Sequence, residues 1–182
     1  MKTTIMIVLA AALGLAAGIL SHRQTRPEVA AEAASPALQF RFPDTNGQEQ
    51  DAAQWRGKIL VVNFWATWCP PCLKEIPEFI QWQDTYRTKN LQFVGIALDD
   101  QASVAEYLQR IAVNYPILIA GDEGGALAHQ LGNIINAVPF TVIVDRQGRI
   151  VHRQPGELTK EQFLRAVEPL LAAENQIADK SL

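Results

Sequence analysis

Apolar positions divide the chain into a strongly hydrophobic start and a longer body with mixed patterning. The apolar run continues from Ile5 to Leu20, which is longer than most signal-peptide cores and slightly short for a full bilayer span. Small residues suited to a signal peptidase first occur far downstream, at Ala31–Ala33. We therefore expect residues 1–21 to be an uncleaved transmembrane anchor, with a cleaved signal and a soluble periplasmic product as the alternative.

The next segment, residues 22–37, contains Ala, Glu and Pro without a helix or strand period. This composition is typical of a flexible spacer. We expect one folded domain over residues 38–173 and a polar tail over residues 174–182.

Within the domain, short apolar runs predict strands and longer amphipathic stretches predict helices. Asn46-Gly47 indicates the turn of a hairpin. The further expected strands are Ile59–Ala66, Leu91–Leu98, Tyr115–Ala120, Phe140–Asp145 and Arg149–Gln154, the last two forming a hairpin around a turn.

Four helices are expected between these strands. The first begins at the cysteines and is kinked at Pro77; the second is capped by Asp100. The others are a short helix after a glycine-rich loop and a last helix opened by a Thr159/Gln162 capping box. Their expected ranges are Cys69–Tyr86, Ala102–Ile111, Ala126–Leu131 (after the loop Gly121–Gly125) and Thr159–Ala173. This order predicts an α/β sandwich whose sheet has a parallel portion and an antiparallel end.

Composition agrees with a globular domain, because 48% of residues are hydrophobic and 19% are charged. The formal net charge is −3, and the basic residues form no stripe along the chain. Nucleic-acid binding is therefore excluded as a function class.

The only two cysteines, Cys69 and Cys72, enclose Pro70 and Pro71. A bond between them closes too small a loop to stabilise the fold appreciably. A structural zinc site needs four protein ligands and a catalytic one three. A copper site made from both cysteines and a histidine, His129 or His152, stays open as an alternative.

Thiol–disulfide exchange is the third possible use of the two cysteines, and their position at the start of a helix favours it. Cys69 at the start of a helix faces free N–H groups and the positive end of the helix dipole, which lower the pKa of its thiol. We expect Cys69 to be exposed and to attack partner disulfides, and Cys72 to be more buried and to resolve the mixed disulfide. Since neither proline has an N–H, the Cys72 amide is the expected donor to the Cys69 sulfur.

Glu75 follows Cys72 by about one helical turn and therefore lies on the same helix face. Partial burial there would raise the pKa of its carboxyl and suit it to move protons for Cys72. An ordinary interaction with the helix dipole explains the same position. Spacing alone leaves both interpretations open.

Two stretches resemble the TlpA/ResA-type membrane-anchored thiol–disulfide oxidoreductases of the thioredoxin superfamily. They are "GKILVVNFWATWCPPCLKEIP" (Gly57–Pro77) and "AVPFTVIVDRQGRIVHRQPGELT" (Ala137–Thr159). The resemblance covers about residues 40–171. It implies a thioredoxin fold, a mixed sheet flanked by helices, with an N-terminal hairpin and a helix–strand insert at Gln101–Ala120.

The resemblance also implies roles for individual residues. Cys69 matches the nucleophile and Cys72 the resolving cysteine of a redox-active disulfide, between Pro70 and Pro71, and Glu75 matches an active-site glutamate. The supporting positions are Trp68 beside the active site, the cis-proline loop Val138-Pro139, and Gly156 near the active-site surface.

Three positions depart from related patterns. Asn63 stands where thioredoxin has a buried aspartate, which makes Glu75 the better candidate for proton transfer. Phe140 stands where cytochrome c-maturation members often have a glutamate after the cis-proline. Ala66 stands where a peroxiredoxin needs a threonine, so peroxidase activity is not expected.

The resemblance implies a periplasm-facing enzyme held in the bacterial inner membrane through residues 5–20. It implies protein disulfides or thiols as partners, a membrane thiol electron donor that keeps the enzyme reduced, and no organic cofactor or metal. The alternatives are an oxidase that donates its disulfide, a copper-binding assembly chaperone that uses Cys69, Cys72 and a histidine, and a non-catalytic binding domain.

Overall fold

The computed structural model describes residues 38–179, all of which belong to one compact unit, Pro36–Leu182. The expected anchor (1–21) and spacer (22–37) lie outside the described residues. Within the described range, none of the helices has the length and apolar character needed to cross a bilayer.

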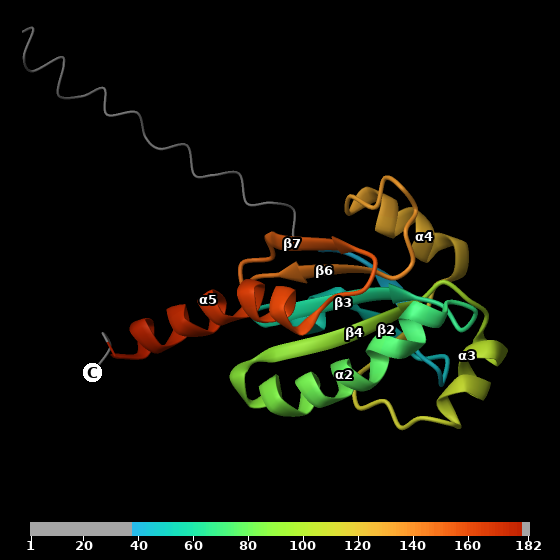
Figure 1. Ribbon diagram of the computed structural model, residues 1–182, viewed down its shortest axis with the longest axis horizontal. Helices are drawn as coiled ribbons and strands as arrows, with labels where there is room; N and C mark the ends of the chain where they lie inside the picture. Colours follow the sequence, from blue (N-terminus) through green and yellow to red (C-terminus); the bar gives the residue numbers. More distant parts are fainter. Residues whose placement is uncertain (1–37, 180–182) are drawn as a thin grey trace, which may run out of the picture. The chain divides into compact units, whose positions relative to one another are not determined.

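A five-stranded mixed sheet forms the centre of this unit (Figure 1), with the strand order β5-β4-β3-β6-β7. β3 pairs in parallel with β4, and β4 with β5, whereas β6 is antiparallel to both β3 and β7. The predicted parallel portion and antiparallel end are therefore confirmed. The strands are β3 (Ile59–Trp65), β4 (Leu91–Ala97), β5 (Ile117–Ile119), β6 (Phe140–Val144) and β7 (Ile150–Pro155).

The predicted N-terminal hairpin is also present. β1 (Arg41–Pro43) pairs antiparallel with β2 (Glu49–Asp51), and the turn contains Gly47 at φ +77°, a backbone conformation that glycine adopts without steric cost. A short 3₁₀ turn, η1 (Ala52–Trp55), leads from the hairpin to β3.

Alternation along the strands gives the sheet two apolar faces. Ile59, Val61 and Trp65 of β3 belong to one buried cluster, together with residues of helices α2 (Pro70–Tyr86), α3 (Gln101–Leu108) and α5 (Lys160–Asp179). Leu60, Val62 and Phe64 belong to a second cluster, with the hairpin and helix α4 (Gly121–Gln130). Because β3 is buried on both faces, its sequence is a continuous apolar run interrupted only by Asn63.

The helices are α2 (Pro70–Tyr86), α3 (Gln101–Leu108), α4 (Gly121–Gln130) and α5 (Lys160–Asp179), with a 3₁₀ turn η2 (Arg87–Lys89) after α2. α2 continues through Pro77, as predicted. Asp100 caps α3 by accepting from the Ser103 N–H at 2.9 Å, although the helix ends before the predicted Ile111.

The prediction of a loop at Gly121–Gly125 is wrong, because α4 begins at Gly121. Packing accounts for one of these glycines, Gly124: a Cβ added there would lie 2.6 Å from the Leu98 side chain and 3.2 Å from that of Ile96. Glycine at this position lets the helix pack closely against β4. From the sequence alone, the same glycine is interpreted as a break in the helix.

The capping box at the start of α5 is confirmed. The Gln162 N–H donates to Thr159 Oγ1 at 3.3 Å, and the Thr159 N–H donates to Gln162 Oε1 at 2.9 Å. α5 extends to Asp179, beyond the predicted end at Ala173, so most of the expected polar tail is helical.

One end of the sheet gathers the residues singled out by the sequence. Phe64 near the end of β3 is paired with Phe140 at the start of β6. Cys69, which follows β3, and Pro139, which precedes β6, therefore lie at the same end of these two paired strands.

Candidate active site

A disulfide joins Cys69 and Cys72 at the N-terminus of α2, with a Cα–Cα distance of 5.3 Å. Cys69 is the N-cap residue, and Pro70 and Pro71 occupy the first two helical positions, where a missing N–H is tolerated. The Cys72 N–H donates to Cys69 Sγ at 3.3 Å, as predicted. Once reduced, Cys69 meets this N–H and the helix dipole, both of which favour the thiolate.

The expectation that Cys69 is exposed is wrong for the oxidised state. Only 4% of Cys69 and 0% of Cys72 is accessible, and both belong to the buried cluster beneath α2. Bonding between the sulfurs and packing on the sheet cover most of the Cys69 side chain. The order of burial is as predicted, since Cys72 is the more deeply buried of the two.

Glu75 is also buried, with 4% of its surface accessible. Asn63 Nδ2 donates to Glu75 Oε1 at 2.8 Å, and the Leu158 N–H donates to Oε2 at 3.0 Å. Asn63 Nδ2 also donates to Thr141 Oγ1 at 3.0 Å. Asn63, which stands where thioredoxin has a buried aspartate, therefore holds the carboxyl group of Glu75 from helix α2.

Burial raises the pKa of Glu75 from the ordinary 4.5 to about 7, against the opposing effect of the hydrogen bonds from Leu158 and Asn63. Desolvation penalises the charged carboxylate, whereas the two donors stabilise it. Glu75 therefore exchanges a proton near neutral pH, where a general acid or base works best.

Replacing Glu75 with glutamine should make folding stability less dependent on pH. Between pH 4.5 and about 7 the folded carboxyl keeps a proton that the unfolded chain releases. Stability from this group is therefore full below pH 4.5 and falls as pH rises through about 7, by about 3 kcal/mol in total. Urea unfolding of oxidised wild type and Glu75→Gln from pH 4 to 9 measures the difference.

Glu123→Gln is the matched control, because Glu123 is exposed on α4 and is not among the charges that act on the Glu75 carboxyl. Its stability curve should run parallel to that of wild type. A Glu75→Gln curve that also runs parallel to wild type would show that Glu75 titrates as an ordinary carboxyl.

The Val138–Pro139 peptide bond is cis, as the resemblance implies. The Gly156 N–H donates to the Pro139 carbonyl at 2.8 Å, so the end of β7 holds the cis-proline loop. Gly156 has φ +83° and no atom within 4 Å of the position a Cβ would take, so open space adjoins it.

The turn before the disulfide is held by a residue from another part of the chain, which sequence reasoning missed. Asp99, which follows β4, accepts hydrogen bonds from the Thr67 N–H at 3.1 Å and from the Thr67 hydroxyl. This carboxylate fixes the turn that presents Trp68, 64% of which is exposed, and Cys69. A polar residue at the carboxyl end of a neighbouring parallel strand was the available signal.

Comparison with known proteins places this site in a family. The Redoxin family model matches residues 31–169. The chain belongs to the Redoxin family.

Relatives of this Redoxin domain are named for thiol–disulfide chemistry. The thiol-disulfide oxidoreductase ResA of Geobacillus kaustophilus is 29% identical over 171 residues, 93% of this chain and 94% of the relative. A thiol:disulfide interchange protein of the thioredoxin family from Chlorobium tepidum is 32% identical, with a TM-score of 0.67 over 75% of this chain and 95% of that one. A secreted disulfide oxidoreductase of Mycobacterium tuberculosis is 25% identical, with a TM-score of 0.61 over 73% and 97%. The thioredoxin-like fold is thus confirmed.

In the described part of the chain, neither histidine lies with the cysteines. His129 lies at the end of α4, and His152 pairs with Ile143 in the middle of β7. Over residues 38–179, no group of three or more His, Cys, Asp or Glu side chains is placed to hold a metal ion.

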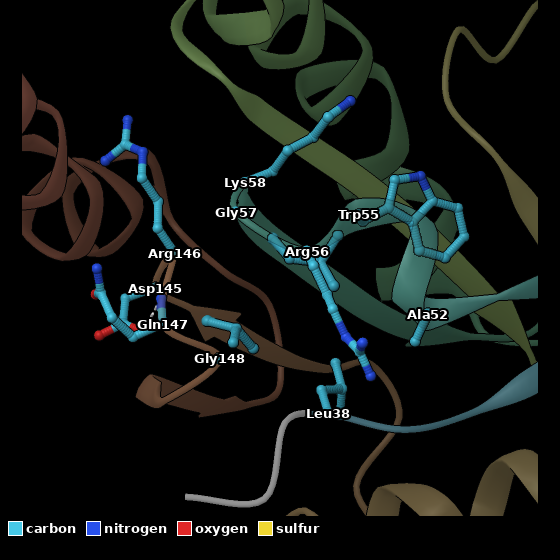
Figure 2. Close-up of a pocket in the computed structure, with 12 residues that line it drawn as sticks. Leu38, Ala52, Trp55, Arg56, Gly57, Lys58, Asp145, Arg146, Gln147 and Gly148 are labelled. Carbon is cyan, nitrogen blue, oxygen red and sulfur yellow. Dashed lines mark hydrogen bonds between the residues drawn. The ribbon is translucent and has the colours of Figure 1, made fainter. Parts of the chain in front are cut away.

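A cavity of about 140 Å³ in the Redoxin domain lies at the other end of the sheet. Its lining includes Leu60 near the start of β3, whereas Cys69 follows the end of that strand; the seven residues of β3 span about 20 Å. Figure 2 shows Arg56 pointing towards Leu38 there. Neither the cysteines nor Glu75 line this cavity, so it is separate from the redox site.

Proposed function

We propose that this thiol–disulfide oxidoreductase works as a reductant of protein disulfides. The observation that carries its chemistry is the Cys69–Cys72 disulfide at the N-terminus of α2, with the Cys72 N–H on the Cys69 sulfur. The resemblance to the TlpA/ResA group supports the direction of electron flow.

The reaction begins with the reduced enzyme. The Cys69 thiolate attacks one sulfur of a partner disulfide, forms a mixed disulfide with it, and expels the partner's other sulfur as a thiolate. Cys72 then attacks Cys69 Sγ, and the second partner sulfur leaves. Two electrons pass to the partner, and the enzyme ends with the disulfide seen in the structure.

Glu75 takes the proton from the Cys72 thiol as Cys72 becomes a nucleophile. Its place one turn beyond Cys72, its burial and its pKa of about 7 support this role. Asn63 orients the carboxylate through its hydrogen bond to Oε1.

The cis-proline loop receives the partner's backbone next to the disulfide. The positions of Val138 and Pro139 at the sheet edge where β3 leads to Cys69 support this, as does the open space at Gly156. Trp68, which precedes Cys69 and is exposed, offers the partner a second contact surface on the side of the disulfide segment.

The enzyme faces the bacterial periplasm and is held in the inner membrane through residues 5–20. The apolar run at those residues supports the membrane attachment, and the secreted relative from M. tuberculosis supports a place outside the cytoplasm. A thiol electron donor in the membrane returns the enzyme to its reduced state. This thiol–disulfide exchange requires no organic cofactor.

Equilibration of the full-length chain with glutathione buffers tests the direction. We expect a reduction potential near that of thioredoxin, about −270 mV. A value near −120 mV, as in a strong oxidant, would reverse the assignment and make the protein a donor of disulfides. Mass spectrometry after acid quenching and thiol alkylation measures the oxidised fraction at each poise.

A further inference from the structure

A tight turn over residues 66–69 joins the end of β3 to α2 and ends at the attacking cysteine. The Cys69 N–H closes this turn by donating to the Ala66 carbonyl at 3.2 Å. The Trp68 side chain at its corner is 64% exposed, so it gives the turn little anchorage on the domain. Polar contacts therefore contribute much of what holds the turn in place.

Asp99 supplies such a contact from beyond the end of β4. Its Oδ2 accepts from the Thr67 N–H at 3.1 Å and from the Thr67 hydroxyl, and its Oδ1 accepts from the Asp100 N–H at 3.0 Å. On one side of Asp99, the Leu98 N–H donates to the Trp65 carbonyl at 2.8 Å. On the other side, Asp100 caps α3. The carboxylate of Asp99 is therefore carried by backbone that is fixed both before and after it.

The start of α2 makes the position of the Cys69 sulfur important. Pro70 and Pro71 occupy the first two helical positions and have no N–H. The first N–H of the helix is therefore that of Cys72, whose nitrogen lies 3.3 Å from Cys69 Sγ. In the oxidised protein the disulfide keeps these atoms together. After reduction, their contact depends on the turn and on the first residues of the helix.

We propose that Asp99 is a positioning residue, which acts through Thr67 to keep the Cys69 sulfur against the Cys72 N–H once the disulfide has been reduced. The inference rests on the proposed function, in which Cys69 is the nucleophile, and adds a residue from outside the CxxC motif.

A fixed turn keeps the thiolate of Cys69 close to the N–H and to the positive end of the helix dipole, whereas a loose turn lets it move away. Support of a reactive group by a neighbouring hydrogen-bonded residue is a general requirement for a precise site. Asp99 thus increases the thiolate fraction of Cys69 by position, although its own negative charge acts in the opposite direction. The two effects differ in sign, so an experiment can separate them.

The test measures alkylation of the reduced full-length chain by iodoacetamide from pH 5 to 10, with mass spectrometry to identify the modified cysteine. Because the thiolate is the reacting species, the rate follows the thiolate fraction. Asp99→Ala should react about tenfold more slowly than wild type near pH 6, since a weakened hydrogen bond to a charged group costs about that factor. The two rates should converge near pH 10, where the thiol is ionised in both proteins.

Asp100→Ala is the matched control. It removes the neighbouring carboxylate, which caps α3 by accepting from the Ser103 N–H and hydroxyl. Loss of this cap should lower stability to urea and leave the alkylation profile unchanged. Asp99→Asn keeps an oxygen that accepts from Thr67, so it should retain most of the wild-type profile. Thr67→Val keeps the shape of the side chain and loses one of the two bonds. It should show a smaller slowing, and it tests the proposal even if Asp99→Ala does not fold.

An Asp99→Ala profile that matches wild type would overturn the proposal. Faster alkylation near pH 6 would also overturn it, because Asp99 would then act only through its negative charge. Equal slowing at every pH would show a change in access to the sulfur, and equal slowing by Asp100→Ala would show an effect of α3; both results contradict the proposal. Wild-type alkylation at Cys72 ahead of Cys69 would refute the nucleophile of the proposed function, whatever the variants show.

Discussion

Replacing Cys69 with serine should abolish disulfide exchange and leave only the uncatalysed background. The thiolate is the attacking species, and a serine hydroxyl does not ionise near neutral pH. Cys72 remains in this variant, but it is fully buried and lies inside the helix rather than at its N-cap. Insulin-disulfide reduction with dithiothreitol as electron source measures the loss.

Cys72→Ser is the matched control for this experiment. It keeps the nucleophile and removes the resolving thiol, so it should accumulate a mixed disulfide with the substrate, visible as a mass increase on a non-reducing gel. A mixed disulfide formed by Cys69→Ser would assign the attack to Cys72 and reverse both roles. Activity that persists in Cys69→Ser would remove the catalytic assignment altogether.

Local patterns were sufficient for the central elements. The continuous apolar run of β3, the prolines after Cys69 and the Thr159/Gln162 box each act through neighbouring residues, and all three predictions hold. The glycines of α4 misled the local prediction, because the need for Gly124 depends on contact with Ile96 in β4 and with Leu98, which follows that strand.

In the redox site, too, some residues can be predicted from local sequence and others only from the fold. The cysteines are recognisable from a short motif, and Glu75 from helical spacing. The partners of Glu75 are not, because Asn63 precedes it by 12 positions and Leu158 follows it by 83. Only the pairing of strands and the packing of α2 on the sheet bring these groups together, and the same holds for Thr67 and Asp99.

The long-range assembly depends most on the aromatic cluster where α5 meets α2 and the sheet. Phe163 of α5 is fully buried, and its ring stacks on Trp82 of α2 with centroids 4.4 Å apart and an interplanar angle of 14°. It also contacts Phe93 of β4 at 5.7 Å and Tyr86 at 5.5 Å. One side chain thus joins two helices and a strand.

Phe163→Ala should lower the free energy of unfolding by about 3–5 kcal/mol, from lost transfer energy and the cavity left among the rings. Phe163→Leu, which keeps most of the volume, should cost less than about 1.5 kcal/mol. Urea unfolding of the oxidised proteins measures both. Because Leu158 lies just before α5 and donates to Glu75, loosening α5 should also disturb the pH dependence of stability that Glu75 confers. Equal losses for alanine and leucine would show that ring geometry, rather than filled volume, holds α5 in place.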